Sequence, residues 1–123
     1  MGPIPTGVHQ IAISCKDVAV ATAFYRDVVG CQFLFESNGM AFLMCGSVRL
    51  MLSPPAAADV AQPLYVYLST NDIDAAAKSL EAKGAKLEGQ PHIVAKLPER
   101  EVWLVHWRDT EGNLMAFMQE KPA

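Results

Sequence analysis

The sequence predicts an α+β fold made of two βαβββ modules in tandem. Their curved mixed sheets surround a cup-shaped site, and the helices lie on the outer face. Three observations predict this fold. The order strand, turn, helix, glycine, strand occurs twice, and an offset of 55 residues places Ile11 on Val66 and Asp17 on Asp72. Each helix is followed by three further strand-like runs. A run rich in proline and small residues separates the two halves.

The first module spans about residues 7–52. Its opening apolar run, VHQIAIS, predicts a strand, and Asp17 stands where the N-cap of the following helix belongs. Val20, Phe24 and Val28 recur every four residues and form the core-facing stripe of that helix. Gly30 ends the helix in the left-handed conformation. The remaining strands are expected at residues 32–36, 40–45 and 48–52, joined by Ser-Asn-Gly and Gly-Ser turns.

The second module spans about residues 64–120 and follows a linker at 53–63, so the chain is a single domain covering residues 1–123. Its first strand, PLYVYLS, leads to an alanine-rich helix that begins after Asp72 and ends at Gly84. Further strands are expected at residues 85–96, with an interruption near Pro91, and at 101–108 and 114–119. The polar stretch at residues 108–113 is the turn of the last hairpin.

Composition excludes several classes of protein. With 123 residues, of which 51% are hydrophobic and 19% charged, the chain is large enough to form a core and is not a disordered tail. A net charge of -3 and scattered basic residues argue against nucleic-acid binding. Three cysteines do not make a disulfide framework and are typical of a reducing cytoplasm. We expect a cytoplasmic protein, with no signal peptide and no membrane span.

The segments FYRDVVG in the first helix and RDTEGNLMAFMQ in the last hairpin, together with the tandem modules, resemble the vicinal oxygen chelate superfamily. That superfamily contains glyoxalase I, bleomycin and fosfomycin resistance proteins, extradiol dioxygenases and methylmalonyl-CoA epimerase. The resemblance covers about residues 7–120. It implies a cup that holds a divalent metal on four side chains, one from the first and one from the last strand of each module.

The resemblance assigns these four metal positions to Gln10, Met51, Tyr65 and Ala116. The carbonyl oxygen of Gln10 is compatible with a metal ion. Met51 and Tyr65 are poor ligands for hard cations, and Ala116 has no donor atom at all. We therefore predict that the full metal-ligand set is lost and expect no cofactor. If a divalent metal does bind, Gln10 and His92 are the residues left to hold it.

Strand pairing predicts which residues point into the cup. A turn at 108–113 pairs Val105 with Ala116, and the preceding hairpin pairs His92 with Val105, so these three residues share one row. His92 then points into the site; the alternative is a partly buried structural histidine. His106 alternates with Val105 and is expected on the helix side, and His9 is also expected to point away from the cup.

The same logic gives the rest of the predicted lining. In module one, Phe33, Met44 and Arg49 form one row, and Phe35, Phe42 and Met51 form the next. In module two the lining is aromatic or sulfur-containing, with two charged residues: Tyr65, Tyr67, Trp103, Trp107, Met118, Glu101 and Lys96. Such a surface binds flat or apolar molecules, and Arg49 would contact an anionic group. The alternative is that the two walls pack on each other as core.

Two functions follow from these observations. The first is a metal-free binding protein for an apolar or aromatic small molecule, as bleomycin resistance proteins are. The second is an enzyme, a glyoxalase-like lyase, an isomerase or a dioxygenase. Such an enzyme would use Gln10, His92 and Glu101 around a divalent metal or as acid and base. In either case we expect a homodimer, because open sheets leave edges and apolar faces that a second copy covers.

Overall fold

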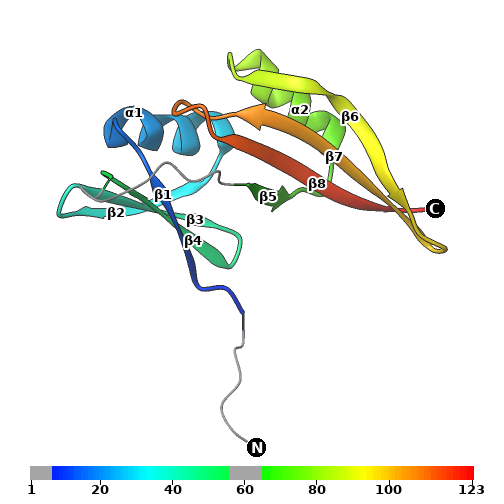
Figure 1. Cartoon of the computed structure of the whole chain (residues 1–123), viewed down its shortest axis with the longest axis horizontal. Helices are drawn as coiled ribbons and strands as arrows, with labels where there is room; N and C mark the ends of the chain where they lie inside the picture. The colour runs from blue at the N-terminus through cyan, green and yellow to red at the C-terminus, as the bar shows by residue number, and fades with distance from the viewer. Residues whose placement is uncertain (1–6, 56–64) are drawn as a thin grey trace, which may run out of the picture. The chain divides into compact units, whose positions relative to one another are not determined.

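The structure is a computed structural model that describes residues 7–55 and 65–123. The chain divides into two compact units, Met1–Asp59 and Val60–Ala123, and each unit contains one module. Each module is a four-stranded mixed sheet with helical structure packed against one face (Figure 1). The predicted linker at 53–63 falls mostly on residues 56–64, which lie outside the described residues.

Module one begins with a strand, continues into a helix and then returns through three strands. Its elements are β1 (Gln10–Ser14), α1 (Val18–Ala23), η1 (Phe24–Val29), β2 (Gln32–Ser37), β3 (Met40–Cys45) and β4 (Val48–Ser53). The strand order is β1-β4-β3-β2, with β1 parallel to β4 and the other pairs antiparallel. β1 and β2 are therefore the edge strands of this sheet.

The helix of module one begins and ends at the residues that the sequence predicts. The side chain of Asp17 accepts a hydrogen bond from the Val20 backbone N–H at 3.1 Å, which caps the first turn. α1 passes into one π-helical turn, η1, and Gly30 ends it with φ 97°. A residue with a Cβ would be strained in that left-handed conformation.

Module two repeats this order with a longer helix and longer strands. Its elements are β5 (Val66–Ser69), α2 (Ile73–Ala82), β6 (Lys86–Lys96), β7 (Arg100–Arg108) and β8 (Leu114–Pro122). The strand order β5-β8-β7-β6 matches that of module one, with β5 parallel to β8. The pairing of β6 with β7 shifts between Glu88 and His92, where the sequence predicts an interruption near Pro91.

The N-terminus of α2 is capped twice. The Asp72 side chain accepts from the Ala75 N–H at 3.0 Å, as the sequence predicts. In addition, Gln119 on β8 accepts from the Ile73 N–H at 2.8 Å and donates to the Asn71 carbonyl at 2.7 Å. These two bonds attach the start of α2 to the last strand and satisfy a backbone donor that the helix leaves free.

Each sheet buries one face beneath its own helix. In module one Ile13, Leu43, Leu50 and Leu52 are at most 1% exposed on the face that α1 covers. In module two the residues α2 covers include Val105, Trp107, Met115 and Phe117. The predicted α+β class and the two tandem modules are confirmed. No helix among the described residues is long and apolar enough to cross a membrane.

Candidate functional site

The open face of the module-one sheet carries two rows of side chains that the helix does not cover. Successive strand residues alternate between the faces, and the pairing of the strands sets which side chains are neighbours. The first row, read across the sheet, contains Gln10, Arg49, Met44 and Gln32. The second row contains Ala12, Met51, Phe42 and Phe35. Five of the six lining residues predicted in this module therefore share one face with Gln10.

Arg49 is the fixed charge of this face. Its Nε donates to Gln10 Oε1 at 2.7 Å, and its guanidinium carbon lies 5.4 Å from the centre of the Phe42 ring. The amide nitrogen of Gln10 in turn contacts the Met51 sulfur at 3.6 Å. The guanidinium is held from two sides while remaining partly exposed, so Arg49 has a fixed orientation on this face.

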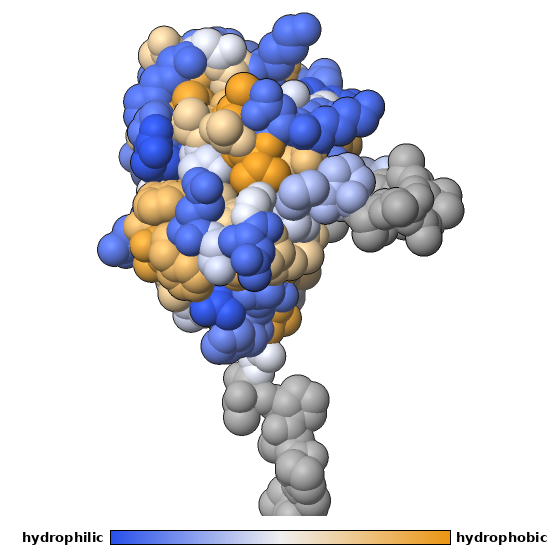
Figure 2. Space-filling model, turned by 90° about the vertical axis from the view of Figure 1, so that its left-hand side faces the viewer, coloured by the Kyte–Doolittle hydropathy of each residue, from blue (hydrophilic) through white to orange (hydrophobic). Residues whose placement is uncertain are grey.

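Beside Arg49 lies an aromatic surface. The rings of Phe35 and Phe42 stack with centroids 4.5 Å apart and an interplanar angle of 21°. Phe42 is buried, whereas Phe35 remains 45% exposed. Exposed hydrophobic residues also occur in patches among hydrophilic ones on the side of the molecule in Figure 2. An exposed phenyl ring next to an oriented cation suits a flat ligand that carries an anionic or carbonyl group.

Phe33 is the exception in module one. The sequence places it in the row of Met44 and Arg49, but it pairs with Leu43, on the face toward α1. The register of β2 against β3 shifts between Phe33 and Phe35, so one extra residue on β2 moves Phe33 to the other face. The prediction for Phe33 is therefore wrong, and a side chain from Gln32 stands in its place.

In module two the predicted register of the last hairpin is wrong by one residue. Ala116 pairs with His106 rather than with Val105, and Met118 pairs with Leu104 rather than with Trp103. A shift of one residue exchanges the two faces of a strand. His106 therefore lies on the open face, and Val105 lies beneath α2.

The cause is the length of the loop between β7 and β8. Arg108 pairs with Leu114, so the loop has one residue fewer than predicted. Asp109 closes it: its Oδ1 accepts from the backbone N–H groups of Glu111 at 2.9 Å and Asn113 at 2.8 Å. Gly112 takes the left-handed conformation, with φ 83°. This local aspartate turn, visible in the sequence as DTEGN, is the signal that identifies His106.

His106, Ala116 and Tyr67 form a row across the open face of module two. Ala116 is only 1% exposed, and the rings of Tyr67 and His106 meet edge to face with centroids 6.4 Å apart. Glu88 on β6 continues the row beyond His106. Ala116, one of the four metal positions that the resemblance assigns, therefore lies between a phenol and an imidazole.

His92 is on the predicted face but not in the predicted row. It pairs with Leu104, so its row is that of Met118 and not that of Ala116. The side chain is exposed, and its Nδ1 lies 2.8 Å from the Gln90 carbonyl oxygen. The shift in the β6 register near Pro91 accounts for this displacement.

Four predicted lining residues of module two are on the face toward α2: Trp103, Trp107, Glu101 and Lys96. Trp107 is fully buried in the core. Trp103 donates from its ring nitrogen to Glu101 at 3.2 Å, and the Lys121 ammonium lies 4.2 Å from the centre of the Trp103 ring. Lys121 also pairs with Asp74 of α2 at 3.5 Å. Glu101 is therefore on the opposite face of the sheet from His92, and the predicted acid–base set does not assemble.

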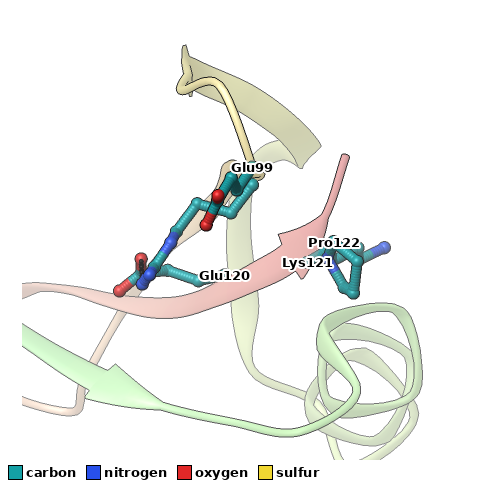
Figure 3. A pocket seen from close by; sticks show the side chains of 5 residues that line it. Glu99, Glu120, Lys121 and Pro122 are labelled. Carbon is teal, nitrogen blue, oxygen red and sulfur yellow. Dashed lines mark hydrogen bonds and ion pairs between the residues drawn. The ribbon is translucent and has the colours of Figure 1, made fainter.

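A separate pocket lies at the end of β8, beside the loop between β6 and β7 (Figure 3). Its volume is about 270 Å³, and its lining is mostly charged: Glu99, Arg100, Glu120, Lys121 and Pro122. Arg100 and Glu120 form an ion pair across it at 2.9 Å, and both side chains are about half exposed. Because these charges already neutralise each other in water, the pocket offers a ligand little binding energy.

The donor set for the metal that the resemblance implies does not fit such an ion. The carbonyl oxygen of Gln10 accepts from Arg49, whose positive charge opposes a cation at the same atom. Met51 offers only a thioether, Tyr65 is 61% exposed ahead of β5, and Ala116 has no donor. Within residues 7–55 and 65–123, no three His, Cys, Asp or Glu side chains gather closely enough to hold a metal ion.

Comparison with known proteins identifies the family. The model of the Glyoxalase/Bleomycin resistance protein/Dioxygenase superfamily matches residues 7–117, and the chain belongs to this superfamily. No curated protein sequence matches the chain.

Solved structures share the fold at low sequence identity. A lactoylglutathione lyase from Agrobacterium tumefaciens is 24% identical, with a TM-score of 0.76 and 94% of each chain covered. TnmS3, an antibiotic binding protein from Streptomyces sp. CB03234, is 20% identical, with a TM-score of 0.78, and the match covers 99% of this chain and 100% of that one. An integron cassette protein from V. cholerae is 19% identical, with a TM-score of 0.79 over 97% of this chain and 98% of that one.

Proposed function

We propose that this chain is a metal-free, small-molecule-binding member of its superfamily. The ligand is an apolar or aromatic molecule that lies against the open face of module one and presents an anionic or carbonyl group to Arg49. One observation carries the proposal: Arg49 is bonded to Gln10 at 2.7 Å and lies over Phe42, beside the exposed ring of Phe35.

The chemistry of this face supports an aromatic ligand. Phe35 is 45% exposed although it stacks on Phe42, so a flat molecule can continue the stack and remove that ring from water. The neighbouring Met44 and Met51 have flexible, polarisable side chains that adapt to different ring shapes. The guanidinium of Arg49 then determines which way round the ligand lies.

Metal loss is part of the proposal. Gln10, the one compatible donor of the implied set, is engaged by a cation, and the other three positions offer a thioether, a phenol and a methyl group. Hard divalent ions require several oxygen or imidazole ligands. The structural likeness to TnmS3, described as an antibiotic binding protein, supports small-molecule binding as a function of this fold.

We also propose that the protein works as a homodimer in the cytoplasm. Each sheet ends in edge strands, β1 and β2 in module one and β5 and β6 in module two, which present backbone groups for pairing. Light scattering at micromolar concentration measures the assembly, and a mass of 13.4 kDa, that of one chain, would contradict the dimer.

Two phenylalanines on the same strand test the binding face. Phe35 is on the open face and Phe33 on the α1 face, and both are exposed. We titrate anilinonaphthalene sulfonate, an aromatic anion that fluoresces when bound, into the native protein and into the Phe35→Ala and Phe33→Ala variants. Loss of one ring stack costs about 1.4 kcal/mol, so Phe35→Ala should weaken binding roughly tenfold.

Phe33→Ala is the matched control and should leave the affinity within about twofold of the native value. Thermal melting of both variants verifies that each is folded. If both substitutions lower the affinity equally, or neither lowers it, the open face of module one is not the binding surface.

A further inference from the structure

Cys31 and Cys45 occupy opposite positions at one end of module one's sheet. Gln32 on β2 pairs with Met44 on β3. Cys31 directly precedes β2 and Cys45 is the last residue of β3, so continuing this register by one residue brings Cys31 opposite Cys45. The backbone fixes both residues: the Cys31 N–H donates to the Tyr25 carbonyl at 2.9 Å, and Cys45 ends β3 directly before the Gly46 turn, where φ is 59°.

The two side chains are neighbours. Each thiol shifts the pKa of the other, upward for Cys31 and downward for Cys45. Opposite residues of antiparallel strands have Cα atoms about 4.5–5.5 Å apart, inside the range of about 4.4–6.8 Å that a disulfide spans. A bond between them therefore needs little movement of the backbone. Cys31 is buried and Cys45 is partly exposed, so one thiol of the pair is accessible to a reagent.

We propose that Cys31 and Cys45 form a reversible thiol–disulfide exchange site that low-molecular-weight disulfides close and low-molecular-weight thiols reopen. The Cys45 thiolate attacks one sulfur of the disulfide, forms a mixed disulfide and releases one thiolate. Cys31 then loses its proton and attacks the Cys45 sulfur as a thiolate, the second thiolate leaves and takes up that proton, and the bond between the two cysteines is complete. The protein loses two electrons, and the small disulfide is reduced to two thiols.

The environment of the pair assigns these two roles. The neighbouring Cys31 thiol lowers the pKa of Cys45 to about 7, although burial opposes that change. The Cys45 thiol, together with burial, raises the pKa of Cys31. The partly exposed Cys45 is therefore the attacking thiolate at neutral pH, and the buried Cys31 resolves the mixed disulfide. This assignment does not depend on the ligand proposed for the open face.

The third cysteine provides the control. Cys15 is fully buried, and its thiol donates to the Ile13 carbonyl at 3.6 Å. We incubate the folded native protein and the Cys15→Ser, Cys31→Ser and Cys45→Ser variants with oxidised glutathione, followed by acid quenching. Free thiols are then counted in denaturant, and the products are identified by intact mass and peptide mapping.

The native protein should fall from three free thiols to one, without glutathione attached, and the mapped bond should join Cys31 to Cys45. Cys15→Ser should close the same bond. Cys31→Ser should stop at a glutathione adduct on Cys45, and Cys45→Ser should form neither product. Dithiothreitol should restore every thiol.

The pH dependence checks the attacking residue. Because the pKa of Cys45 is about 7, the rate of closure should rise roughly tenfold from pH 6 to pH 8 and then level off. Native protein that keeps three thiols, or that accumulates stable glutathione adducts without closing, overturns the proposal whatever the variants do. Closure through Cys15 would also overturn it.

Discussion

Replacing Arg49 by methionine tests whether an oriented guanidinium contributes to ligand binding. Methionine keeps a long unbranched side chain beside Met44 and Met51 and removes the charge together with the guanidinium donors. A hydrogen bond to a charged group contributes about 1.5–3 kcal/mol. Arg49 is partly exposed, so solvent screening favours the lower end, and each 1.4 kcal/mol is about tenfold in affinity. We expect anilinonaphthalene sulfonate to bind Arg49→Met roughly tenfold more weakly than the native protein.

Two comparisons isolate the charge. Phenylnaphthylamine has the same aromatic frame without the sulfonate, and its affinity should change less than about twofold, since ring stacking is retained. Arg26→Met removes an exposed arginine of the same module that is already paired with Asp27 at 2.8 Å, and it should leave both probes unaffected. Fluorescence titration at low and moderate salt measures the affinity of each probe for all three proteins. Salt should reduce the difference in affinity between the native protein and Arg49→Met for the anionic probe alone.

The stability of Arg49→Met shows whether a change in affinity comes from the binding surface and not from unfolding. In Arg49→Met the Gln10 oxygen loses its donor, but Gln10 is only partly buried, so water can take the place of Arg49. The free energy of unfolding should therefore change by less than about 1 kcal/mol. Equal losses for the charged and the neutral probe would mean that Arg49 shapes the surface without binding the anion. No loss for either would place the ligand elsewhere.

Two further predictions concern the loop and the metal. Asp109→Ala removes the carboxylate that accepts hydrogen bonds from Glu111 and Asn113, at a position only 7% exposed. It should lower the free energy of unfolding, measured in urea, by about 2–4 kcal/mol. Asp109→Asn keeps the Oδ1 acceptor and should lower it by less than half as much. Equal losses would show that the hydrogen bonds do not close the loop. Purified protein should carry less than about one divalent ion per two chains by elemental analysis. Stoichiometric metal that a chelator removes and that Gln10→Ala abolishes would contradict the ligand assignment.

Much of the fold follows from local signals in the sequence. Asp17 and Asp72 cap the helices because their carboxylates accept from the backbone N–H three residues later, and Gly30 and Gly84 end them because they take the left-handed conformation. The β3–β4 hairpin turns at Gly46-Ser47, and the pairing of Cys45 with Val48 leaves a single possible register. For this reason the predicted neighbours of Arg49 on β3 and β4 are correct.

The errors arise where one residue more or less in a strand or loop changes the register. Phe33 and His92 both lie beside irregularities, on β2 and β6. No residue in the sequence marks the one on β2, and Pro91 marks the one on β6 without giving the size of the shift. A β-bulge depends on how a strand packs against its partner, which alternation of polar and apolar residues does not reveal. The predicted rows are reliable in the strands that tight turns join, and unreliable in the edge strands β2 and β6.

The Asp109 loop has the largest consequence for the site, because it selects which side chains of β7 share the face of Ala116. With six loop residues that face would present Trp103, Val105 and Trp107; with five it presents Leu104, His106 and Arg108. Val105 and Trp107 then complete the core beneath α2, and His106 and Arg108 remain on the open face. The shorter loop is therefore favoured twice, by the hydrogen bonds of Asp109 and by burial of Val105 and Trp107. A predicted hairpin register should satisfy both conditions before a histidine is assigned to a site.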